Sequence, residues 1–266
     1  MKRERKGSEE SLDDEGTEKK LKAEGLIPKK KDYRMRAHIN PLNTTPFPFP
    51  PHHSHVDWRA HYPAHFGCSP EDNLKVTCNT VEHPSFYEKP RDYELGGKEV
   101  SVIDIGCGYG GLLFGLAPVL PNKRLLGLEI RDKLVNYVAE KIRGYRIKNP
   151  GVYDNISVVR TNTMRHLGQY FPRASLDKIF ICFPDPHFKA KNYRRRIINT
   201  GFLSEYAYLL KPKGLLYCIT DVLELHEWHM DHLRSHRMFR ELKGYDDPCV
   251  QVMRAKTEEG QKVERN

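Results

Sequence analysis

Short apolar runs alternate with amphipathic stretches from Val100 to the end of the chain. Five runs have the length of buried strands, and each ends at polar or turn-forming residues. Between them lie segments such as 134–145 and 200–211, in which apolar residues recur at helical spacing. Because strands and helices alternate at this pitch, we expect an α/β fold whose mostly parallel sheet carries helices on both faces. The five runs are EVSVIDIG, KRLLGLEI, NISVVRTN, LDKIFICFP and GLLYCITD.

The N-terminal part of the chain has a different composition. Residues 1–32 are rich in charge and nearly free of large apolar side chains, which predicts a disordered tail. We expect the folded domain to cover residues 33–266 and to begin with an N-terminal extension over residues 33–66. The polar, proline-containing stretch 68–97 is expected to be a loop insertion.

Length and charge bound the class of protein. The chain has 266 residues, enough for one domain with a sizeable core plus tails. Its 44 Lys and Arg residues outnumber its 35 Asp and Glu residues, which gives a formal net charge of +9. This excess favours an anionic partner, of which nucleic acid is the commonest, although basic tails alone would also produce it. No apolar run is long enough to span a bilayer.

The six cysteines are scattered, and no two of them form a CxxC pair. This pattern is typical of a reducing compartment and argues against a disulfide framework or a zinc knuckle. Basic clusters at residues 2–6 and 29–31 match short nuclear-import signals, which is a weak pattern. We therefore expect a nuclear protein that also occurs in the cytoplasm.

A glycine-rich loop ends the first apolar run. Asp104 is followed by Gly106, Gly108 and two further glycines before the next helical pattern begins. Glycine permits a tight turn and a close approach of a ligand, and the first amides of the helix then face that ligand. The second run ends at Glu129, at the spacing expected of an acid that binds ribose hydroxyl groups. Together these features predict a cofactor site, and a glycine turn without a ligand is the alternative.

The spacing of the glycines favours one class of cofactor. Dinucleotide sites use GxGxxG, with a pyrophosphate at the helix N-terminus. This chain has DxGxGxG, and its acid would repel a pyrophosphate but could hold a cationic amino-acid group. The loop resembles the S-adenosyl-L-methionine site of the Rossmann-like class I methyltransferases, and LLKPKGLLYCITD resembles their fifth strand with its lead-in. The resemblance implies S-adenosyl-L-methionine as cofactor and a seven-stranded sheet.

Asp185 follows the fourth apolar run and stands between Pro184 and Pro186. Each proline fixes its own φ and biases the residue before it toward extended geometry, so Asp185 does not readily join a helix. Its carboxylate is therefore expected at the edge of the sheet where ligands bind. A burst of lysines and arginines follows between residues 189 and 196 and could hold nucleic-acid phosphates. A solvated helix face is the alternative.

The sequence FPDPHFK resembles the motif of the tRNA (guanine-N7-)-methyltransferases. It differs from the (D/N/S)PP(Y/F) motif of the adenine-N6 and cytosine-N4 DNA methyltransferases. Eukaryotic members are also similar to this chain at DYRMRAHINP, DWRAHYP, DIGCGYGGLL, LGLEIR, TNTMRHL, ITDVLELHEW and TEEGQKV, so the resemblance covers nearly everything from Tyr33 onward. It implies methylation of N7 of a guanosine in the variable loop of tRNA. It also implies a heterodimer with a WD-repeat non-catalytic subunit.

The resemblance assigns roles to individual residues. Asp185 would orient the guanine and offset its developing charge, because N7 carries a lone pair and no proton has to be removed. Asn162 would contact the adenine, with a turn residue as the alternative, and Asp221 would touch the substrate, with helix capping as the alternative. Cofactor contacts are expected from Asp104, Gly106, Gly108, Glu129, Ile130, Arg131, Asn162, Thr163, Cys182, Thr257 and Glu259, and tRNA contacts from Asp221, Arg34, Arg36, Lys189, Lys191, Arg194 and Arg195.

Two other functions compete with this interpretation. Methylation of another base or of a small molecule is disfavoured by the basic run and by the lack of the DNA-type motif. A non-catalytic RNA-binding role is disfavoured by the intact glycine loop, Glu129 and Asp185. Four histidines between residues 226 and 236 could share a helix face, but no Cys or second carboxylate cluster completes a site, so we expect no metal.

Overall fold

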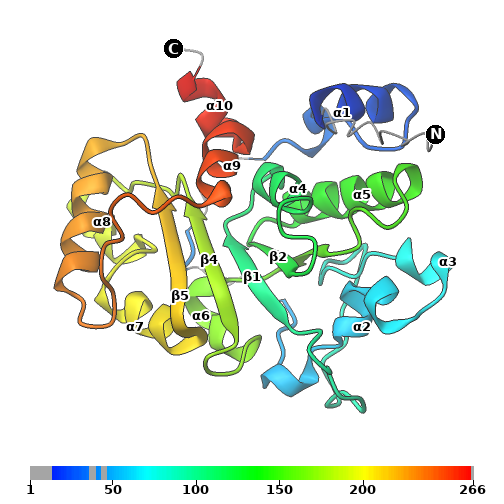
Figure 1. Ribbon diagram of the computed structural model, residues 1–266, viewed down its shortest axis with the longest axis horizontal. Helices are drawn as coiled ribbons and strands as arrows, with labels where there is room; N and C mark the ends of the chain where they lie inside the picture. Colours follow the sequence, from blue (N-terminus) through cyan, green and yellow to red (C-terminus); the bar gives the residue numbers. More distant parts are fainter. Residues whose placement is uncertain (1–13, 36–39, 43–46, 265–266) are drawn as a thin grey trace, which may run out of the picture.

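The five predicted apolar runs form the five strands of one sheet. The computed structural model describes residues 14–35, 40–42 and 47–264, and in it the strands are all parallel in the order β3-β2-β1-β4-β5 (Figure 1). The inner strands are buried on both faces, as parallel strands between helices must be. The strands are β1 Val100–Ile105, β2 Arg124–Glu129, β3 Ile156–Arg160, β4 Leu176–Cys182 and β5 Leu210–Ile219.

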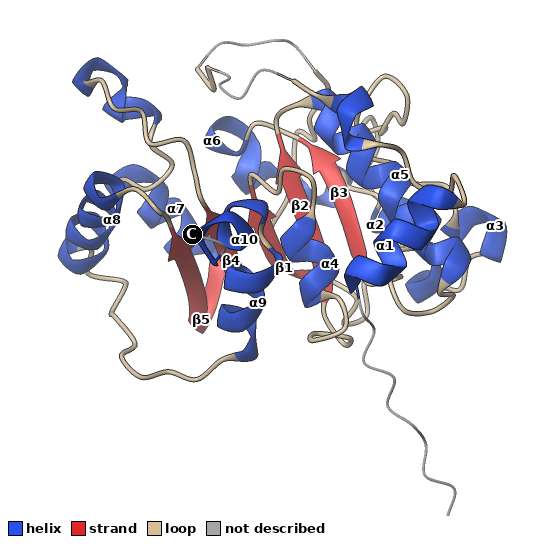
Figure 2. Cartoon of the chain, turned by 90° about the horizontal axis from the view of Figure 1, so that it is seen from above, coloured by secondary structure: helices blue, strands red, loops and turns tan. Residues whose placement is uncertain are grey.

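Helices cover both faces of the sheet (Figure 2). One core cluster joins the sheet to α4, α5 and α9, and a second joins the opposite face to α2 and α7. Neighbouring residues of one strand, such as Val102 and Ile103, belong to different clusters, as the period of a strand requires. Among the described helices, none is long and apolar enough to cross a membrane. The helices are α1 Asp14–Ala23, α2 Trp58–His61, α3 Pro70–Asn73, α4 Gly111–Leu116, α5 Asp132–Lys148, α6 Thr163–His166, α7 Thr200–Leu209, α8 Leu223–Ser235, α9 Pro248–Lys256 and α10 Glu258–Glu264.

The number of strands differs from the prediction. The class resemblance predicted seven strands, and the described residues form five, so the prediction is wrong for this part of the chain. Residues 236–247, which follow α8, form turns and loops instead of a strand. Their charged side chains and Gly244, which has a φ of 65°, favour turns over a buried strand. Within the described residues β5 is therefore an edge strand.

The N-terminal tail is ordered from residue 14 onward, which differs from the predicted disorder of residues 1–32. α1 packs against α5 (Figure 1) and fully buries the side chain of Leu21. The ammonium group of Lys141 on α5 donates to Oε2 of Glu18 at 2.8 Å. These tertiary contacts outweigh the polar composition from which disorder was predicted. Residues 1–13 lie outside the described residues.

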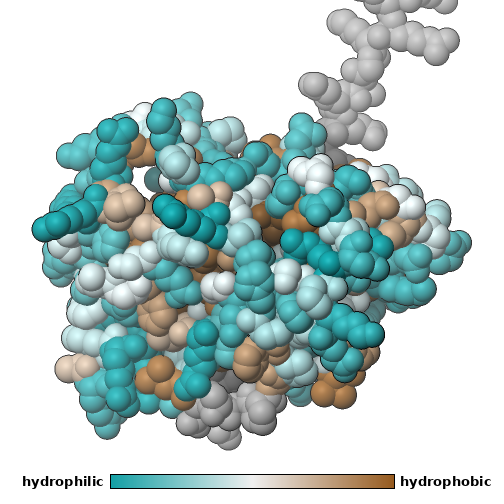
Figure 3. Space-filling view, turned by 90° about the horizontal axis from the view of Figure 1, so that it is seen from below, coloured by the Kyte–Doolittle hydropathy of each residue, from teal (hydrophilic) through white to brown (hydrophobic). Residues whose placement is uncertain are grey.

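The segment 68–97 contains α3 and otherwise consists of loops. Its Val76 and Cys78 are buried in the core cluster that contains α5. Two of its apolar side chains face solvent instead: Val81 is 95% exposed and Phe86 is 75% exposed. On the face shown in Figure 3, apolar residues lie in small groups between hydrophilic ones.

Candidate active site

The loop between β1 and α4 is built on a left-handed backbone. Gly106, Gly108 and Gly110 have φ values of 77°, 54° and 78°, a region that favours glycine. The amide of Gly106 donates to the carbonyl oxygen of Leu128 at 2.7 Å, which ties the loop to the end of β2. A Cβ atom at Gly106 or Gly108 would meet nothing within 4 Å, so both glycines face open space. This space is a cradle that a bound ligand would fill, and it fits the predicted cofactor.

Glu129 ends β2 beside this loop, and its side chain is 2% exposed. Its carboxylate accepts the amide of Gly108 at 3.2 Å and those of Ile130 and Arg131 at 2.8 and 3.0 Å. The guanidinium of Arg131 donates to both oxygens, through Nε at 3.1 Å and Nη2 at 3.0 Å. The structure therefore brings Gly108, Glu129, Ile130 and Arg131 together, as predicted for one site.

Asp104 lies under the glycine loop and is 3% exposed. Burial, together with the nearby negative charge of Glu129, raises the pKa of Asp104 to about 7. A cationic group placed beside this carboxyl would favour its ionised form and lower the pKa again. Asp104 is thus suited to receive the amino group of an amino-acid ligand.

The segment after β4 is strained on both sides of Asp185. Phe183 and His187 have φ values of 49° and 48°, and non-glycine residues occupy this left-handed region at a cost of about 1–3 kcal/mol each. The amide of Phe183 donates to the carbonyl oxygen of Ile219 at 2.8 Å, which holds the start of the segment against β5. Asp185 is partly exposed. Strain of this kind is typical of functional segments that the surrounding structure holds in place.

The negative charge of Asp185 acts on Arg131, the partner of Glu129. Burial disfavours the charged form of Arg131, but its hydrogen bond to Glu129 and the negative charges of Glu129 and Asp185 raise the pKa of Arg131 overall. β2 and β4 flank β1 on either side, and their carboxyl ends lie at the same edge of the sheet, where ligands bind to such folds. The charge of Asp185 thus reaches Arg131, the residue that pairs with Glu129; the roles of Asp185 and Glu129 in binding base and cofactor stay predictions.

The C-terminal helices cover the same edge of the sheet. α9 packs against α4, which begins at the glycine loop. Thr257, between α9 and α10, is buried; its hydroxyl donates to the carbonyl of Met253 at 2.7 Å and accepts the amide of Gly260 at 3.1 Å. Burial raises the pKa of the Cys182 thiol, and the charge of Glu259 contributes to this increase. Cys182 and Glu259, both predicted cofactor contacts, thus come from different elements to the same region.

Asn162 follows β3, is 4% exposed and caps α6. Its Oδ1 accepts the amide of Met164 at 3.2 Å, and its Nδ2 donates to the carbonyl of Pro41 at 2.6 Å. The turn role that the sequence allowed for Asn162 is therefore present. Contact of Asn162 and Thr163, the first residue of α6, with adenine stays a prediction.

Asp221 lies just beyond β5 and is exposed. The capping residue of α8 is Val222, and no side chain caps that helix. The alternative role of Asp221 as a helix cap is therefore wrong, and its carboxylate faces solvent at the carboxyl edge of the sheet.

Four of the predicted phosphate contacts lie directly after the Asp185 segment. They lie on or next to a short 3-10 helix, η5, Ala190–Arg195. Three of them are exposed and the fourth is half-buried. The basic segment is therefore one turn-rich unit attached to the end of β4. The exposed residues are Lys189, Lys191 and Arg194, and the half-buried one is Arg195.

The second predicted basic arm is only partly described. Arg34 is exposed and ends a 3-10 helix, η1, Lys30–Tyr33. The ammonium group of Lys30 lies 5.1 Å from the ring centre of Tyr109 in the glycine loop, so this arm reaches the cofactor edge of the sheet. Arg36 lies outside the described residues.

For Arg196 the expectation from the sequence, a phosphate contact on the surface, is wrong. This residue closes the basic run, and we grouped it with the phosphate contacts, but the structure buries it to 1% exposure. The apolar pair Ile197 and Ile198, which directly follows, is a local hint of burial. Two of the side chains that contact its guanidinium, Glu224 and Trp228, come from a distant part of the chain, and no sequence pattern marks them as its partners.

The histidines between residues 226 and 236 do not point toward a common centre; they contact different partners. Burial lowers the pKa of His229 to about 4. His232 stacks on Trp228 with ring centres 4.2 Å apart, and Nε2 of His236 lies 3.1 Å from Oγ of Ser204. In the part of the chain that the structure describes, no three His, Cys, Asp or Glu side chains are grouped as metal ligands.

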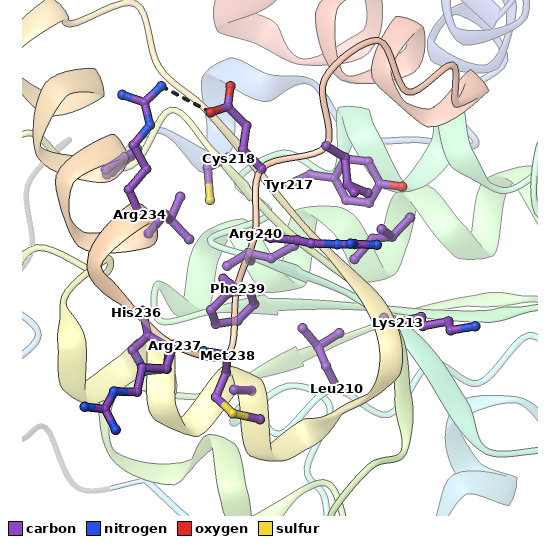
Figure 4. Close-up of a pocket in the computed structure, with 18 of the residues that line it drawn as sticks. Leu210, Lys213, Tyr217, Cys218, Arg234, His236, Arg237, Met238, Phe239 and Arg240 are labelled. Atoms are coloured by element: carbon purple, nitrogen blue, oxygen red, sulfur yellow. Dashed lines mark hydrogen bonds and ion pairs between the residues drawn. The ribbon is translucent and has the colours of Figure 1, made fainter.

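A groove of about 1170 Å³ lies along the open edge of β5, between α8 and the loop that follows it (Figure 4). Apolar side chains such as Leu210, Met238 and Phe239 line it. Arg234 and Arg237 belong to its lining as well. Neither the glycine loop nor Asp185 contributes to the groove, so it is distinct from the site described above.

Fold and site together define a class I methyltransferase. The parallel sheet, the DxGxGxG loop and the acid that ends β2 are its three marks, and residues 98–266 match a family profile described as a putative methyltransferase. Two solved methyltransferases are distantly similar. Coclaurine N-methyltransferase shares 22% identity over 44% of this chain and 29% of its own, with a TM-score of 0.34. Precorrin-6y C5,15-methyltransferase from Geobacter metallireducens shares 18% over 52% and 64%, with a TM-score of 0.39.

Curated relatives narrow the class to one family. A tRNA (guanine-N(7)-)-methyltransferase of Chaetomium globosum is 45% identical over 248 residues, which are 90% of this chain and 85% of the relative. One of Oryza sativa subsp. indica is 44% identical over 246 residues, 91% and 88% of the two chains. The chain belongs to the tRNA (guanine-N7-)-methyltransferase family, as its FPDPHFK motif indicated.

Proposed function

We propose that this chain transfers a methyl group from S-adenosyl-L-methionine to N7 of a guanosine in the variable loop of tRNA. The observation that carries the proposal is the position of Asp185 after β4, between two prolines and between two residues with left-handed backbone, where its charge acts on Arg131, the partner of Glu129. Family membership supplies the substrate class, because the relatives are tRNA (guanine-N(7)-)-methyltransferases over nearly their whole length.

Different residues of the site would bind different parts of the cofactor. Glu129 would accept hydrogen bonds from the ribose hydroxyls in place of the Arg131 guanidinium, which occupies both of its oxygens in this structure, and the glycine loop lets that part of the ligand approach the backbone. Asp104 is suited to the cationic amino group. When bound, S-adenosyl-L-methionine supplies an electrophilic methyl group on a sulfonium sulfur. Thr257 and Glu259 close the site from the C-terminal helices.

The reaction needs orientation more than proton transfer. The N7 lone pair forms the new bond to the methyl carbon while the bond from carbon to sulfur breaks, and sulfur keeps that electron pair. The base becomes cationic, and no proton leaves it. The carboxylate of Asp185 would accept hydrogen bonds from the guanine N–H groups and offset the new charge. Holding N7 in line with the methyl group supplies most of the acceleration.

The basic surface would bind the tRNA backbone. Lys189, Lys191, Arg194 and Arg195 adjoin the Asp185 segment, and Arg34 ends an arm that reaches the glycine loop. Cations at these places would contact phosphates on both sides of the target guanosine. Asp221 is exposed at the same carboxyl edge and would face the substrate.

We also propose a WD-repeat subunit as a partner and a nuclear location. Resemblance to eukaryotic members of the family supports the partner, and the basic clusters at residues 2–6 and 29–31 support nuclear import. Purification of the tagged chain from its own cells, with mass spectrometry of co-purifying proteins, tests the first. Fractionation of those cells tests the second. Absence of a stoichiometric WD-repeat protein, or a purely cytoplasmic pool, would contradict them.

Mass spectrometry of tRNA nucleosides tests the enzymatic proposal. Unmodified tRNA is incubated with the chain, its co-purified partner and S-adenosyl-L-methionine, and 7-methylguanosine is expected to accumulate at one position in the variable loop. Asp185→Ala serves as the negative control. A different methylated nucleoside would indicate another base as the target. Binding of tRNA without any methylation would indicate a non-catalytic RNA-binding protein.

A further inference from the structure

Arg196 stands out because a positive charge has been buried beside the Asp185 segment. Its side chain is 1% exposed, whereas Lys189, Lys191 and Arg194 in the same basic run face solvent. Burying an unpaired guanidinium is costly, so such a side chain persists where it is fully paired. A residue that served only to bind phosphate would gain nothing from this burial.

The contacts of Arg196 join three separate elements. Nη2 pairs with Oε1 of Glu224 on α8 at 2.5 Å, and the guanidinium lies against the rings of both Tyr193 on η5 and Trp228 on α8, 3.8 and 4.6 Å from their centres. The third contact is the informative one: Nε donates to the carbonyl oxygen of Pro186 at 2.9 Å. Arg196 therefore ties the residue after Asp185 to α8 and η5.

The PDPH segment, residues 184–187, has few backbone N–H groups that could hold it against the sheet. Two of its four residues are prolines, which have no N–H group to donate to the sheet. His187 in addition occupies a left-handed backbone conformation that costs energy. An outside donor to the Pro186 carbonyl can hold such a segment in the strained geometry. Arg196 is that donor, and Glu224 and the two rings fix its guanidinium in turn.

We infer that Arg196 is a positioning residue for methyl transfer: it fixes the PDPH segment, and with it the carboxylate of Asp185, at the distance that an in-line attack requires. The inference rests on the role proposed for Asp185. We assign η5 a structural role beside phosphate binding, because its Tyr193 contacts the guanidinium of Arg196 and helps to hold it in place.

Two substitutions test this role. Arg196→Met keeps the length and the apolar packing but removes the charge and the donor, and Arg196→Lys keeps only the charge, since an ammonium lacks the planar fork. At saturating tRNA and cofactor, the single-turnover rate should fall about 100-fold in Arg196→Met, a loss typical of a misplaced group, and less in Arg196→Lys. The dissociation constants for S-adenosylhomocysteine and tRNA should stay at the parent values.

Arg234→Met is the matched control. Arg234 lies on α8 and, like Arg196, pairs with a glutamate, Glu241, at 3.1 Å, but it is exposed and its partner lies in the loop after α8. Its removal should leave the rate unchanged. Chemical rescue adds a second readout: methylguanidine should restore part of the rate of Arg196→Ala, because it can occupy the place of the guanidinium against the rings of Tyr193 and Trp228. It should not rescue Asp185→Ala.

The outcomes separate this inference from the proposed function. If Asp185→Ala is inactive while both Arg196 variants react at the parent rate, Arg196 does not position the segment and the inference is wrong. If the Arg196 variants lose tRNA affinity but keep the saturated rate, Arg196 acts on tRNA binding, which also overturns it. Full activity of Asp185→Ala would instead refute the role of Asp185. Should Arg196→Met fail to fold, Arg196→Lys and Glu224→Gln decide, and parent rates in both would overturn the inference.

Discussion

At the scale of residues, two buried carboxylates at the glycine loop meet different surroundings. Glu129 accepts hydrogen bonds from the amides of Gly108, Ile130 and Arg131 and from the Arg131 guanidinium. Asp104 is buried near that negative charge, and its pKa rises to about 7. The carboxylate of Glu129 is thus already hydrogen-bonded on both oxygens, whereas a cationic ligand would stabilise the ionised form of Asp104. A pH dependence of cofactor binding in the neutral range is therefore expected from Asp104.

Cofactor affinity should rise with pH through the neutral range. The folded-state pKa of Asp104, about 7, lies above its ordinary value of 3.8, so Asp104 makes the free protein less stable as pH rises between these values. A bound ammonium group favours the ionised form, so titration with S-adenosylhomocysteine should give tighter binding at about pH 8 than at about pH 6. Asp104→Asn should flatten both trends, and an unchanged pH dependence in that variant would contradict the assignment.

Loss of the Glu129 charge should weaken the cofactor site without unfolding the chain. Glu129→Gln should reduce affinity for S-adenosylhomocysteine by about 10- to 100-fold, the worth of hydrogen bonds to a charged acceptor. Glu140→Gln on α5, which removes a half-buried acid away from the loop, is the control. Isothermal titration calorimetry measures both variants. Parent affinity in Glu129→Gln would exclude this carboxylate as a ligand of the cofactor.

At the scale of elements, the basic η5 segment should supply salt-dependent tRNA affinity. Replacing Lys189, Arg194 and Arg195 together by Ala should weaken binding and lower the slope of log K against log salt by up to about 0.9 for each phosphate that is no longer neutralised. A control variant removes the same charge from the exposed residues Lys213, Arg237 and Arg240. Filter binding over a salt series compares them. Equal slopes in the two triple variants would mean that η5 is only a solvated surface.

The docking of α1 on α5 should contribute measurable stability. Burial alone would raise the pKa of Glu18, but Lys141 and Lys22 lower it to about 2, so this contribution is present above about pH 4.5 and is lost as pH falls toward 2. Glu18→Gln leaves Lys141, which is 4% exposed, without its charge partner and should cost about 2 kcal/mol in the free energy of unfolding.

The partly exposed pair of Lys148 and Glu24 joins the same two parts of the chain and provides the comparison for Glu18. Glu24→Gln should cost less than about 1 kcal/mol, since exposed ion pairs contribute little. Urea unfolding of both variants at neutral pH measures the difference. Equal costs would show that α1 is not held by the buried pair.

At the scale of the whole molecule, the sequence was informative wherever function depends on local pattern. The alternation of apolar runs predicted the parallel sheet, and the ends of β1, β2 and β4 carry Asp104, Glu129 and Asp185 because ligands bind at that edge. Contacts between residues that are distant in the sequence could not be predicted, because no local pattern of residues marks them. The docking of α1, the burial of Arg196 and the strain at Phe183 depend on residues far apart in the chain, and the sixth and seventh strands were expected from class resemblance alone.

The central claim is that Asp185 orients guanine and does not remove a proton. Single-turnover methylation of tRNA by the parent, Asp185→Asn and Asp185→Ala, over a pH series at saturating cofactor, tests it most directly. At saturating cofactor, the pH dependence of cofactor affinity that we expect from Asp104 no longer affects the rate. We predict that Ala loses most of the rate at unchanged cofactor affinity, that Asn keeps more because its amide retains one acceptor oxygen, and that the parent rate follows no titration near neutral pH. A parent rate that titrates like a general base, or full activity in Asp185→Ala, would contradict the account.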